Sequence, residues 1–245
     1  MIIIASDYDG TLNHHGISEA DKNAITKFRE KGNKFGLVTG RSLSQALWVL
    51  KDLEKSKCEV DFVICCTGGI RLNNKGEIES VKKQKIGEFL PKMVEYAKTL
   101  DIGGFDISNE LTYCYVDTRG KISQDFKGLN GEITQANSWF YKEEDAEKFR
   151  NYLRENFSGE IEAFRNGGSV DIPPKGVSKV SGIYDYAQNY ENVKIYAVGD
   201  NVNDIPMLEE FDSYAVSNAR EEAKAAAKHQ CDRIADMIEE ILKEN

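Results

Sequence analysis

MIIIASDYDGTL, residues 1–12, combines a short apolar strand with a pair of carboxylates. Residues 2–4 are a run of β-branched side chains that suits a buried parallel strand and is too short for an ordinary helix. Asp7 and Asp9 follow at the carboxyl end of this strand, where open α/β sheets bind their ligands. Two carboxylates this close repel each other unless a cation or a proton lies between them. The stretch therefore predicts a metal or acid–base site.

The string DxDG also occurs in calcium loops and in ordinary Asp-Gly turns. An EF-hand loop needs further oxygen ligands and a glutamate at set positions, and Leu12, Asn13 and His14 do not continue that pattern. The place of the string directly after an apolar strand favours a metal or acid–base site over a simple turn.

The composition limits the classes of protein to which the chain can belong. A length of 245 residues allows one large or two modest domains with a sizeable core. A hydrophobic content of 40% and a charged content of 30% are typical of soluble globular proteins. The net charge of -9 argues against nucleic acid or an anionic membrane as a partner. We expect a monomer or a weak homodimer.

Cysteine usage and hydropathy favour a cytoplasmic protein. The five cysteines are an odd number and contain no CxxC pair, which suits reduced thiols. No apolar run approaches membrane-spanning length, and the N-terminal apolar segment lacks a basic lead and a cleavage site. We therefore expect this segment to be a strand and not a signal peptide.

The first part of the chain repeats a strand, turn and helix pattern. Ser18 and Asp21 form a capping-box pattern at the start of a helix that ends at Gly32. A strand over 34–38, a helix with apolar positions from 43 to 53 and a strand over 62–66 follow. Such a repeat predicts βαβ units and a parallel sheet.

The pattern changes in the middle third of the chain. Strands over 70–72 and 78–81 flank the turn 73–76 and indicate a hairpin. We expect further alternating elements there, namely a helix over 88–100, strands over 103–107 and 112–117, a charged helix over 143–156, and strands over 160–164 and 169–172. This mixture predicts a separate α+β unit.

The first pattern returns near residue 177. The elements expected there are a helix over 177–189, a strand over 193–198, a helix over 205–210, a strand over 214–216, and helices over 221–229 and 233–243. The simplest organisation is a Rossmann-like α/β core of residues 1–82 and 172–245, with a parallel sheet and helices on both faces. An inserted α+β cap of residues 83–171 interrupts it, with linkers near 80–85 and 166–173.

Four predicted strand ends carry polar or glycine signals. They are Asp7 with Asp9, Thr39 with Gly40, Gly68 with Gly69, and Asp200 with Asn203 and Asp204. In a parallel sheet all four open onto the same edge. Asp200 and Asp204 are four positions apart, so a helix that starts there lets both carboxylates face one site. Together these strand ends predict one polar site at that edge.

The four strings that surround these positions resemble the motifs of the haloacid dehalogenase-like phosphotransferases. DYDGTL is similar to the first motif, VTGRS to the second, KGVSK to the third and GDNVND to the fourth. The resemblance is specifically to the Cof-type phosphatases of subclass IIB, whose large α/β cap is inserted between the second and third motifs. It covers the core, whereas the cap matches in position and size.

The resemblance implies an aspartyl-phosphate mechanism. Asp7 matches the nucleophile, and Asp9 matches the general acid/base that protonates the leaving oxygen and then deprotonates water. Mg²⁺ is implied because a phosphate dianion must approach an ionised Asp7; the implied ligands are Asp7, the backbone carbonyl of Asp9 and Asp200. Asp204 either binds the metal directly or holds Asp200 and a lysine in place.

The resemblance also implies groups that bind phosphate. Thr39 and Gly40 would offer a hydroxyl and strand-end amides to the phosphoryl oxygens, and Asn203 would add an amide. The third-motif lysine has two candidates: the string GVSK favours Lys179 over Lys175, although a valine replaces the usual glycine that follows it.

Other polar residues have less specific signals. Arg165 and Asn166 are candidates for substrate contact in the cap. Arg41 is either a ligand or a salt-bridge partner, and the pair Gly167–Gly168 is either a hinge or a hairpin turn.

The sequence predicts a Mg²⁺-dependent phosphatase that acts on a small phosphorylated metabolite, with a sugar phosphate as one candidate. A sugar-phosphate mutase of the phosphomannomutase type is an alternative, but its cap would need to hold a second phosphate, usually with several arginines. Arg119, Arg150, Arg154 and Arg165 form no dense cluster in the sequence. A catalytically silent metabolite-binding module is a further alternative, but such a module would be expected to lose Asp7 or Asp9.

Overall fold

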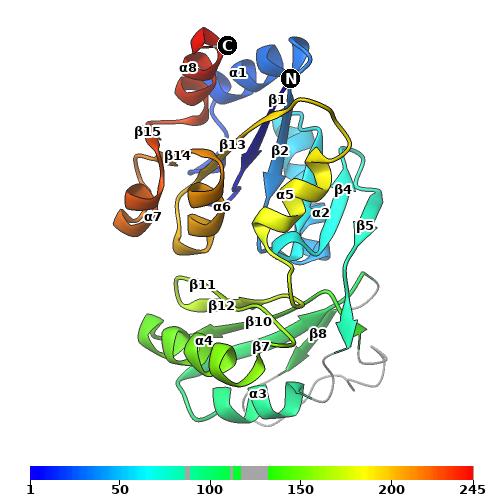
Figure 1. The fold of residues 1–245 in the computed structure, drawn as a ribbon, viewed down its shortest axis with the longest axis vertical. Coiled ribbons are helices and arrows are strands. Elements are labelled where there is room, and N and C mark those ends of the chain that lie inside the picture. Colours follow the sequence, from blue (N-terminus) through cyan, green and yellow to red (C-terminus); the bar gives the residue numbers. More distant parts are fainter. Residues whose placement is uncertain (86–88, 111–112, 117–131, 245) are drawn as a thin grey trace.

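The computed structural model describes residues 1–85, 89–110, 113–116 and 132–244 of the chain. Figure 1 shows that these residues form two bodies, one built on an eight-stranded sheet and the other on a five-stranded sheet. The chain crosses from the first to the second after β5 (Ile78–Val81) and returns after β12 (Ser169–Ile172).

The larger sheet is built around β1 (Ile2–Ser6), whose residues are all buried. β1 pairs in parallel with β13 (Lys194–Gly199) on one side and with β2 (Lys34–Val38) on the other. The remaining strands are β3 (Phe62–Cys65), β4 (Ile70–Asn73), β14 (Asp212–Val216) and β15 (His229–Cys231). The strand order is β15-β14-β13-β1-β2-β3-β4-β5. All pairings are parallel except those of the hairpin β4–β5 at one edge.

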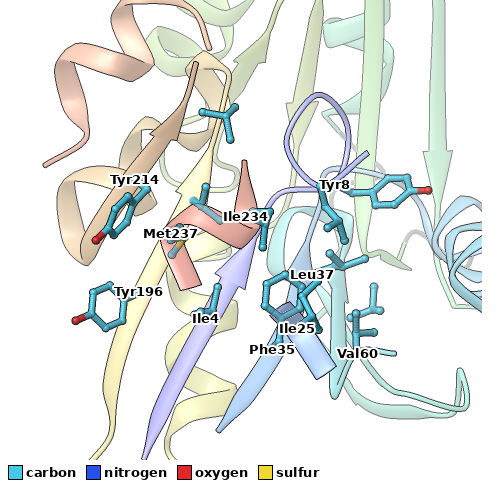
Figure 2. Close-up of a cluster of buried hydrophobic side chains, with 14 of the residues drawn as sticks. Ile4, Tyr8, Ile25, Phe35, Leu37, Val60, Tyr196, Tyr214, Ile234 and Met237 are labelled. Atoms are coloured by element: carbon cyan, nitrogen blue, oxygen red, sulfur yellow. The ribbon is translucent and has the colours of Figure 1, made fainter. Parts of the chain in front are cut away.

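Helices cover both faces of this sheet, as the sequence predicts. Successive β1 residues point to opposite faces: Ile2 and Ile4 join one hydrophobic cluster, and Ile3 and Ala5 join another. Figure 2 shows the first cluster, in which Ile4 packs with side chains of α1 and α8. The helices of that face are α1 (Glu19–Glu30), α2 (Leu43–Ser56) and α8 (Ile234–Glu244), with the shorter α7 (Glu221–Ala226) beside them. The opposite face carries α5 (Lys179–Ala187) and α6 (Ile205–Glu210).

The second body has its own hydrophobic core. Its sheet is antiparallel with the order β11-β12-β10-β7-β8, and two helices pack on one face of it. Figure 1 shows these helices on the side away from the larger sheet. The elements are α3 (Leu90–Ala97), β7 (Ile102–Ser108), β8 (Tyr113–Val116), β10 (Gln135–Phe140), α4 (Glu143–Phe157) and β11 (Phe164–Asn166). A short pair, β6 (Gln84–Lys85) with β9 (Glu132–Ile133), adds a two-stranded sheet.

The N-terminal cap of helix α1 and the hairpin of β11 and β12 agree with the sequence prediction. Ser18 accepts a hydrogen bond from the amide of Asp21 and starts α1, which confirms the predicted capping. Gly167 and Gly168 form the turn between β11 and β12, so the hairpin interpretation is confirmed.

Three predicted elements differ from the structure. The helix expected over 221–229 ends at Ala226, because His229 pairs with Tyr214 in the parallel edge strand β15. The strand expected over 160–164 is shifted to β11, and the linker expected over 166–173 contains β12. Residues 88, 112 and 117 of the expected elements lie outside the described residues.

The sequence also failed to predict β10, the central strand of the five-stranded sheet. Buried and half-buried positions alternate along β10, but its residues Ala136, Asn137 and Ser138 are small or polar. The sequence therefore lacks the alternation of apolar and polar residues that indicates a strand. No helix in the described part of the chain has both the length and the apolar character needed to cross a bilayer.

Phe28 of α1 tests the packing of the larger body, because its side chain has no exposed surface in the first cluster. We expect Phe28→Ala to lower the free energy of unfolding by ~3–5 kcal/mol, since it leaves a cavity. Urea unfolding followed by circular dichroism measures this change. Trp48→Ala is the control, because Trp48 is 74% exposed; its effect should stay within ~0.5 kcal/mol. Equal effects of the two substitutions would contradict this packing.

Candidate active site

The register of the central strands brings two acidic motifs together. Ser6 of β1 lies beside Val198 of β13, and the amide of Asp7 donates a 2.9 Å hydrogen bond to the Val198 carbonyl. Asp7 and Asp200 therefore leave neighbouring parallel strands at the same edge of the sheet. The predicted convergence of these two strand ends is present in the structure.

Lys179 links the acidic motifs. It is the first residue of α5, after Ser178, whose hydroxyl accepts a hydrogen bond from the amide of Ser181. Lys179 Nζ lies 2.5 Å from Asp7 Oδ1 and 2.6 Å from Asp204 Oδ1, and the residue is only 2% exposed. A buried ammonium group thus bridges two buried carboxylates.

Asp204 holds this arrangement in place. Its Oδ1 accepts the hydrogen bond of Lys179, and its Oδ2 accepts hydrogen bonds from the amides of Asp200 (3.0 Å) and Asn201 (3.1 Å). These bonds fix the turn that carries Asp200 relative to the lysine. Asp204 is fully buried at the end of the short helix η3 (Val202–Asp204), which also carries the buried Asn203.

Asp7, Asp200 and Asp204 offer a set of oxygen ligands that fits a hard cation. Carboxylate oxygens of the three residues lie within 4.8 Å of one another. Thr11 Oγ1 donates a 2.7 Å hydrogen bond to Asp200 Oδ1 and orients that carboxylate. At Gly10, whose φ is +81°, a Cβ would lie 2.5 Å from Asp200 Oδ2, so the close approach requires glycine. Oxygen ligands of this kind suit Mg²⁺.

The charges within the cluster are strongly coupled. Burial raises the pKa of Asp7 well above its ordinary value; Lys179 opposes this shift, and Asp204 adds to it. Burial also raises the pKa of Asp200. Burial disfavours the charged form of Lys179, but Asp204 and Asp7 outweigh it, so the lysine pKa is raised. A bound divalent cation would relieve the repulsion among the three carboxylates.

Asp9 lies apart from this buried cluster. Its side chain is 54% exposed, and Arg41 holds it in a bidentate pair in which both N···O distances are 2.7 Å. Arg41 is thus a salt-bridge partner, one of its two predicted roles. The backbone amide of Arg41 also donates to Thr39 Oγ1 at 3.2 Å within the second motif, and its side chain joins this motif to the first through Asp9.

The other predicted strand ends lie around the cluster. Thr39 is buried at the end of β2, where its amide donates to the Ile64 carbonyl. The carbonyl of Gly40 accepts a 2.8 Å hydrogen bond from Gln135 of β10. At Gly68 a Cβ would lie 2.0 Å from the Ser178 carbonyl, so this glycine lets the third strand end pack against the start of α5.

The remaining candidates divide between the site and the surface. Lys175 is half-exposed, and its Nζ lies 3.0 Å from Glu162, away from Asp7. Arg165 pairs with Glu143 and Glu147 of α4, so its guanidinium lies on the helix side of the smaller sheet. Asn166 Oδ1 accepts a 2.9 Å hydrogen bond from Asn201, beside Asp200.

Several residues that the sequence did not single out belong to this region. Thr11 lies within the first motif, two positions after Asp9, and this place in the motif was the available signal for a role in the site. Gln135 and Asp171 come from the smaller body, where no motif marks them. Asp171 is 2% exposed, and its Oδ1 accepts a 2.5 Å hydrogen bond from Asn137.

Comparisons with known proteins agree with this geometry. A model of the haloacid dehalogenase-like hydrolase family matches residues 4–237. No curated protein matches the chain. Among solved structures, the chain is similar to a haloacid dehalogenase-like hydrolase from B. subtilis, with 18% identity, a TM-score of 0.81 and coverage of 98% of this chain and 99% of that chain.

Two further neighbours are phosphatases. The subclass IIB sugar phosphatase BT4131 shares 21% identity at a TM-score of 0.79, over 98% of this chain and 99% of that chain. BT1666 from Bacteroides thetaiotaomicron shares 23% identity at a TM-score of 0.77, over 99% of this chain and 94% of that chain. At these identities, the likeness shows a common fold.

Removal of the bridging lysine tests the buried cluster. We expect Lys179→Met to lower the free energy of unfolding by ~3–5 kcal/mol in metal-free buffer, because two buried carboxylates lose their partner. Urea unfolding measures the change. The matched control is Lys175→Met, which removes a half-exposed lysine paired with Glu162 and should change stability by less than ~1 kcal/mol. A similar loss in both variants would contradict the bridge.

Asp171 should make stability depend on pH. Burial raises its pKa from the ordinary 3.8 to about 7, so between these values the folded state holds a proton that the unfolded state releases. The stability that this group confers therefore falls as the pH rises through that window. We expect the free energy of unfolding of Asp171→Asn minus that of the wild type to grow from pH ~4 to pH ~7, by up to ~4 kcal/mol, and then to level off. Urea unfolding across this pH range measures it, and a constant difference would contradict the raised pKa.

Proposed function

Because the chain belongs to the haloacid dehalogenase-like hydrolases, we propose that it is a Mg²⁺-dependent phosphatase that hydrolyses a small phosphorylated metabolite. The reaction would proceed through an aspartyl-phosphate on Asp7. The observation that carries this proposal is the contact of Lys179 Nζ with both Asp7 and Asp204, with Asp200 alongside. This arrangement offers a carboxylate nucleophile next to fixed positive charge.

In the first step, Asp7 would attack phosphorus, and the bond between phosphorus and the leaving oxygen would break. Asp9 would donate a proton to that oxygen, since two positions of separation let it face the leaving group while Asp7 faces phosphorus. Arg41 donates to both oxygens of Asp9, so one of these hydrogen bonds would have to open for Asp9 to carry the proton that it donates. In the second step, Asp9 would take a proton from the water that attacks the aspartyl-phosphate.

The phosphoryl charge would be balanced by groups of the core. Asp7, Asp200 and the backbone carbonyl of Asp9 would hold Mg²⁺, which when bound would offset the negative charge of the carboxylates and the phosphate. Lys179, Thr39, Gly40 and Asn203 would contact the phosphoryl oxygens. We assign Asp204 a positioning role, because both its oxygens already accept hydrogen bonds from Lys179 and the turn at Asp200.

We propose that residues 1–82 and 172–245 are the catalytic core and that residues 83–171 are the cap. The separate hydrophobic cores of the two bodies support this division. The cap would exclude bulk water and contact the leaving group, with Asn166 as one contact candidate; Arg165, which faces α4, is a less direct one. Cys58, Cys65, Cys66 and Cys231 are free and buried, which supports a cytoplasmic location. We further propose a monomer or a weak homodimer.

A sugar-phosphate mutase is the second candidate, because the structure gathers arginines that are spread out in the sequence. Arg150, Arg154 and Arg165 line one groove of about 380 Å³ together with Val202 and Ile205. These three arginines, which form no dense cluster in the sequence, thus come together in the fold, and Arg119 lies outside the described residues. The groove is lined by none of the catalytic candidates, which favours the phosphatase. Release of inorganic phosphate from a hexose phosphate, without formation of an isomer, would separate the two activities.

The nucleophile assignment predicts loss of activity in Asp7→Asn. We expect the variant to hydrolyse p-nitrophenyl phosphate ~10³-fold or more slowly than the wild type, because an amide cannot form the acyl phosphate. The rate of p-nitrophenol release measures this, and circular dichroism checks that the variant is folded.

Asp212→Asn is the matched control, because Asp212 is the first residue of β14 and so lies at the amino end of the parallel strands, whereas Asp7 lies at their carboxyl end. This control should keep wild-type activity, and wild-type activity should vanish in EDTA and return with Mg²⁺. Equal activity of Asp7→Asn and the wild type would contradict the nucleophile assignment. Absence of activity in the wild type itself would favour a silent binding module.

A further inference from the structure

Asp171 is a buried carboxylate with one oxygen left unpaired. Its Oδ1 accepts the hydrogen bond from Asn137, but its Oδ2 has no hydrogen-bond partner among the residues that the structure describes. The residue is 2% exposed, so bulk water does not satisfy this oxygen. An unpaired buried carboxylate oxygen is costly, and its usual explanation is a water molecule or a ligand group that belongs beside it.

The unpaired oxygen points at the phosphate-binding turn. A Cβ at Gly40 would lie 2.5 Å from Asp171 Oδ2, so β12 can approach the turn this closely only because residue 40 is a glycine. The charges of Lys179 and Asp204 both act on the pKa of Asp171, which places the carboxylate within reach of the catalytic cluster. Asp171 is thus a cap side chain next to the point where the phosphate ester would lie.

Asp171 belongs to a polar row on the core-facing side of the cap sheet. Asp106, Asn137 and Asp171 are direct cross-strand partners on β7, β10 and β12. Their chain neighbours Ile107, Ala136 and Val170 lie in the cap hydrophobic core, so the row faces the other way. Above its pKa of about 7, Asp171 is ionised and only accepts hydrogen bonds, and a hydroxyl group is the uncharged donor that such an oxygen needs.

We propose that Asp171, oriented by Asn137, is a specificity-determining residue that accepts a hydrogen bond from a hydroxyl group of the leaving group and disfavours leaving groups that carry negative charge. The inference rests on the proposed phosphatase function. Lys179 and the bound cation offset the charge of the phosphoryl group, but no described lysine or arginine forms an ion pair with Asp171. A second anionic group on the substrate would therefore meet a carboxylate that no ion pair neutralises.

Entry of the leaving group requires the cap to move. Asp171 Oδ2 lies against Gly40, and Gln135 Nε2 donates a 2.8 Å hydrogen bond to the Gly40 carbonyl. Asn201 and Asn166 form a second bridge between the two bodies. A substrate reaches Asp171 only when β12 separates from this turn, and the hydrogen bond to Asp171 is then gained as the cap closes over the leaving group.

Glycerol phosphate and phosphoglycerate test this proposal. Glycerol phosphate has a hydroxymethyl group where phosphoglycerate has a carboxylate, and the two compounds are otherwise identical. At pH ~8 or above, where Asp171 is ionised, we expect the wild type to favour glycerol phosphate in kcat/KM. In Asp171→Asn, the ratio of kcat/KM for phosphoglycerate to that for glycerol phosphate should rise ~10-fold or more, since the repelling charge is gone. In Asp171→Ala, kcat/KM for glycerol phosphate should fall ~10-fold or more relative to that for p-nitrophenyl phosphate, which has no hydroxyl group.

Asp101→Asn is the matched control, because Asp101 is an exposed cap aspartate paired with Lys142. It should leave both ratios unchanged. The proposal would be overturned if the ratio of kcat/KM values in Asp171→Asn stayed within ~2-fold of the wild-type ratio. It would also be overturned if both Asp171 variants lost kcat/KM equally on all three substrates, which would assign Asp171 a structural role. Hydrolysis of p-nitrophenyl phosphate by the wild type without any preference between the two matched substrates would overturn this proposal alone. Absence of hydrolysis of any of the three would overturn the proposed function.

Discussion

The buried ammonium group of Lys179 between Asp7 and Asp204 is the interaction on which the site depends. Carboxylates from two strands come close together in a buried place, and they do so only because a cation compensates them. The backbone provides the room: Gly10 lets Asp200 approach the first motif, and Gly68 lets the third strand end pack under the start of α5. Asp204 then ties the lysine to the turn that carries Asp200. The cost of burying these charges explains why four distant segments must meet at one point.

The two bodies contribute different properties to this point. The core supplies fixed charges on the ends of parallel strands, which are rigid because helices cover both faces of their sheet. The cap supplies neutral amides and the polar row of a separate sheet. It is joined to the core by side-chain hydrogen bonds and by the ion pair of Arg220 with Glu143. Such polar contacts are individually weak, so the cap movement that we propose would leave both hydrophobic cores intact. In the proposed function, chemistry and selectivity would thus lie on different bodies.

The sequence predicted the core well because local signals there agree with the fold. The apolar run at residues 2–4, the cap at Ser18 and the polar strand ends each indicate their own structure, and the resemblance to a known family added roles for Asp7, Asp9 and Lys179. The cap was harder. β10 lacks a clear alternation of apolar residues, and the strand β15 forms only because it pairs with β14. The position of Asp171 opposite Gly40 depends on how two bodies meet, and no local pattern encodes that contact.

Chemical trapping of the covalent intermediate tests the central claim most directly. The enzyme would be quenched with acid during turnover of a phosphate ester, and borohydride would then reduce any acyl phosphate to the alcohol, which converts the aspartate concerned into homoserine. Tandem mass spectrometry of the N-terminal peptide should place homoserine at position 7, since Asp7, at the end of its strand and beside Lys179, is the proposed nucleophile. Homoserine at position 9 or 200 instead, or no reduced residue during steady turnover, would contradict the account.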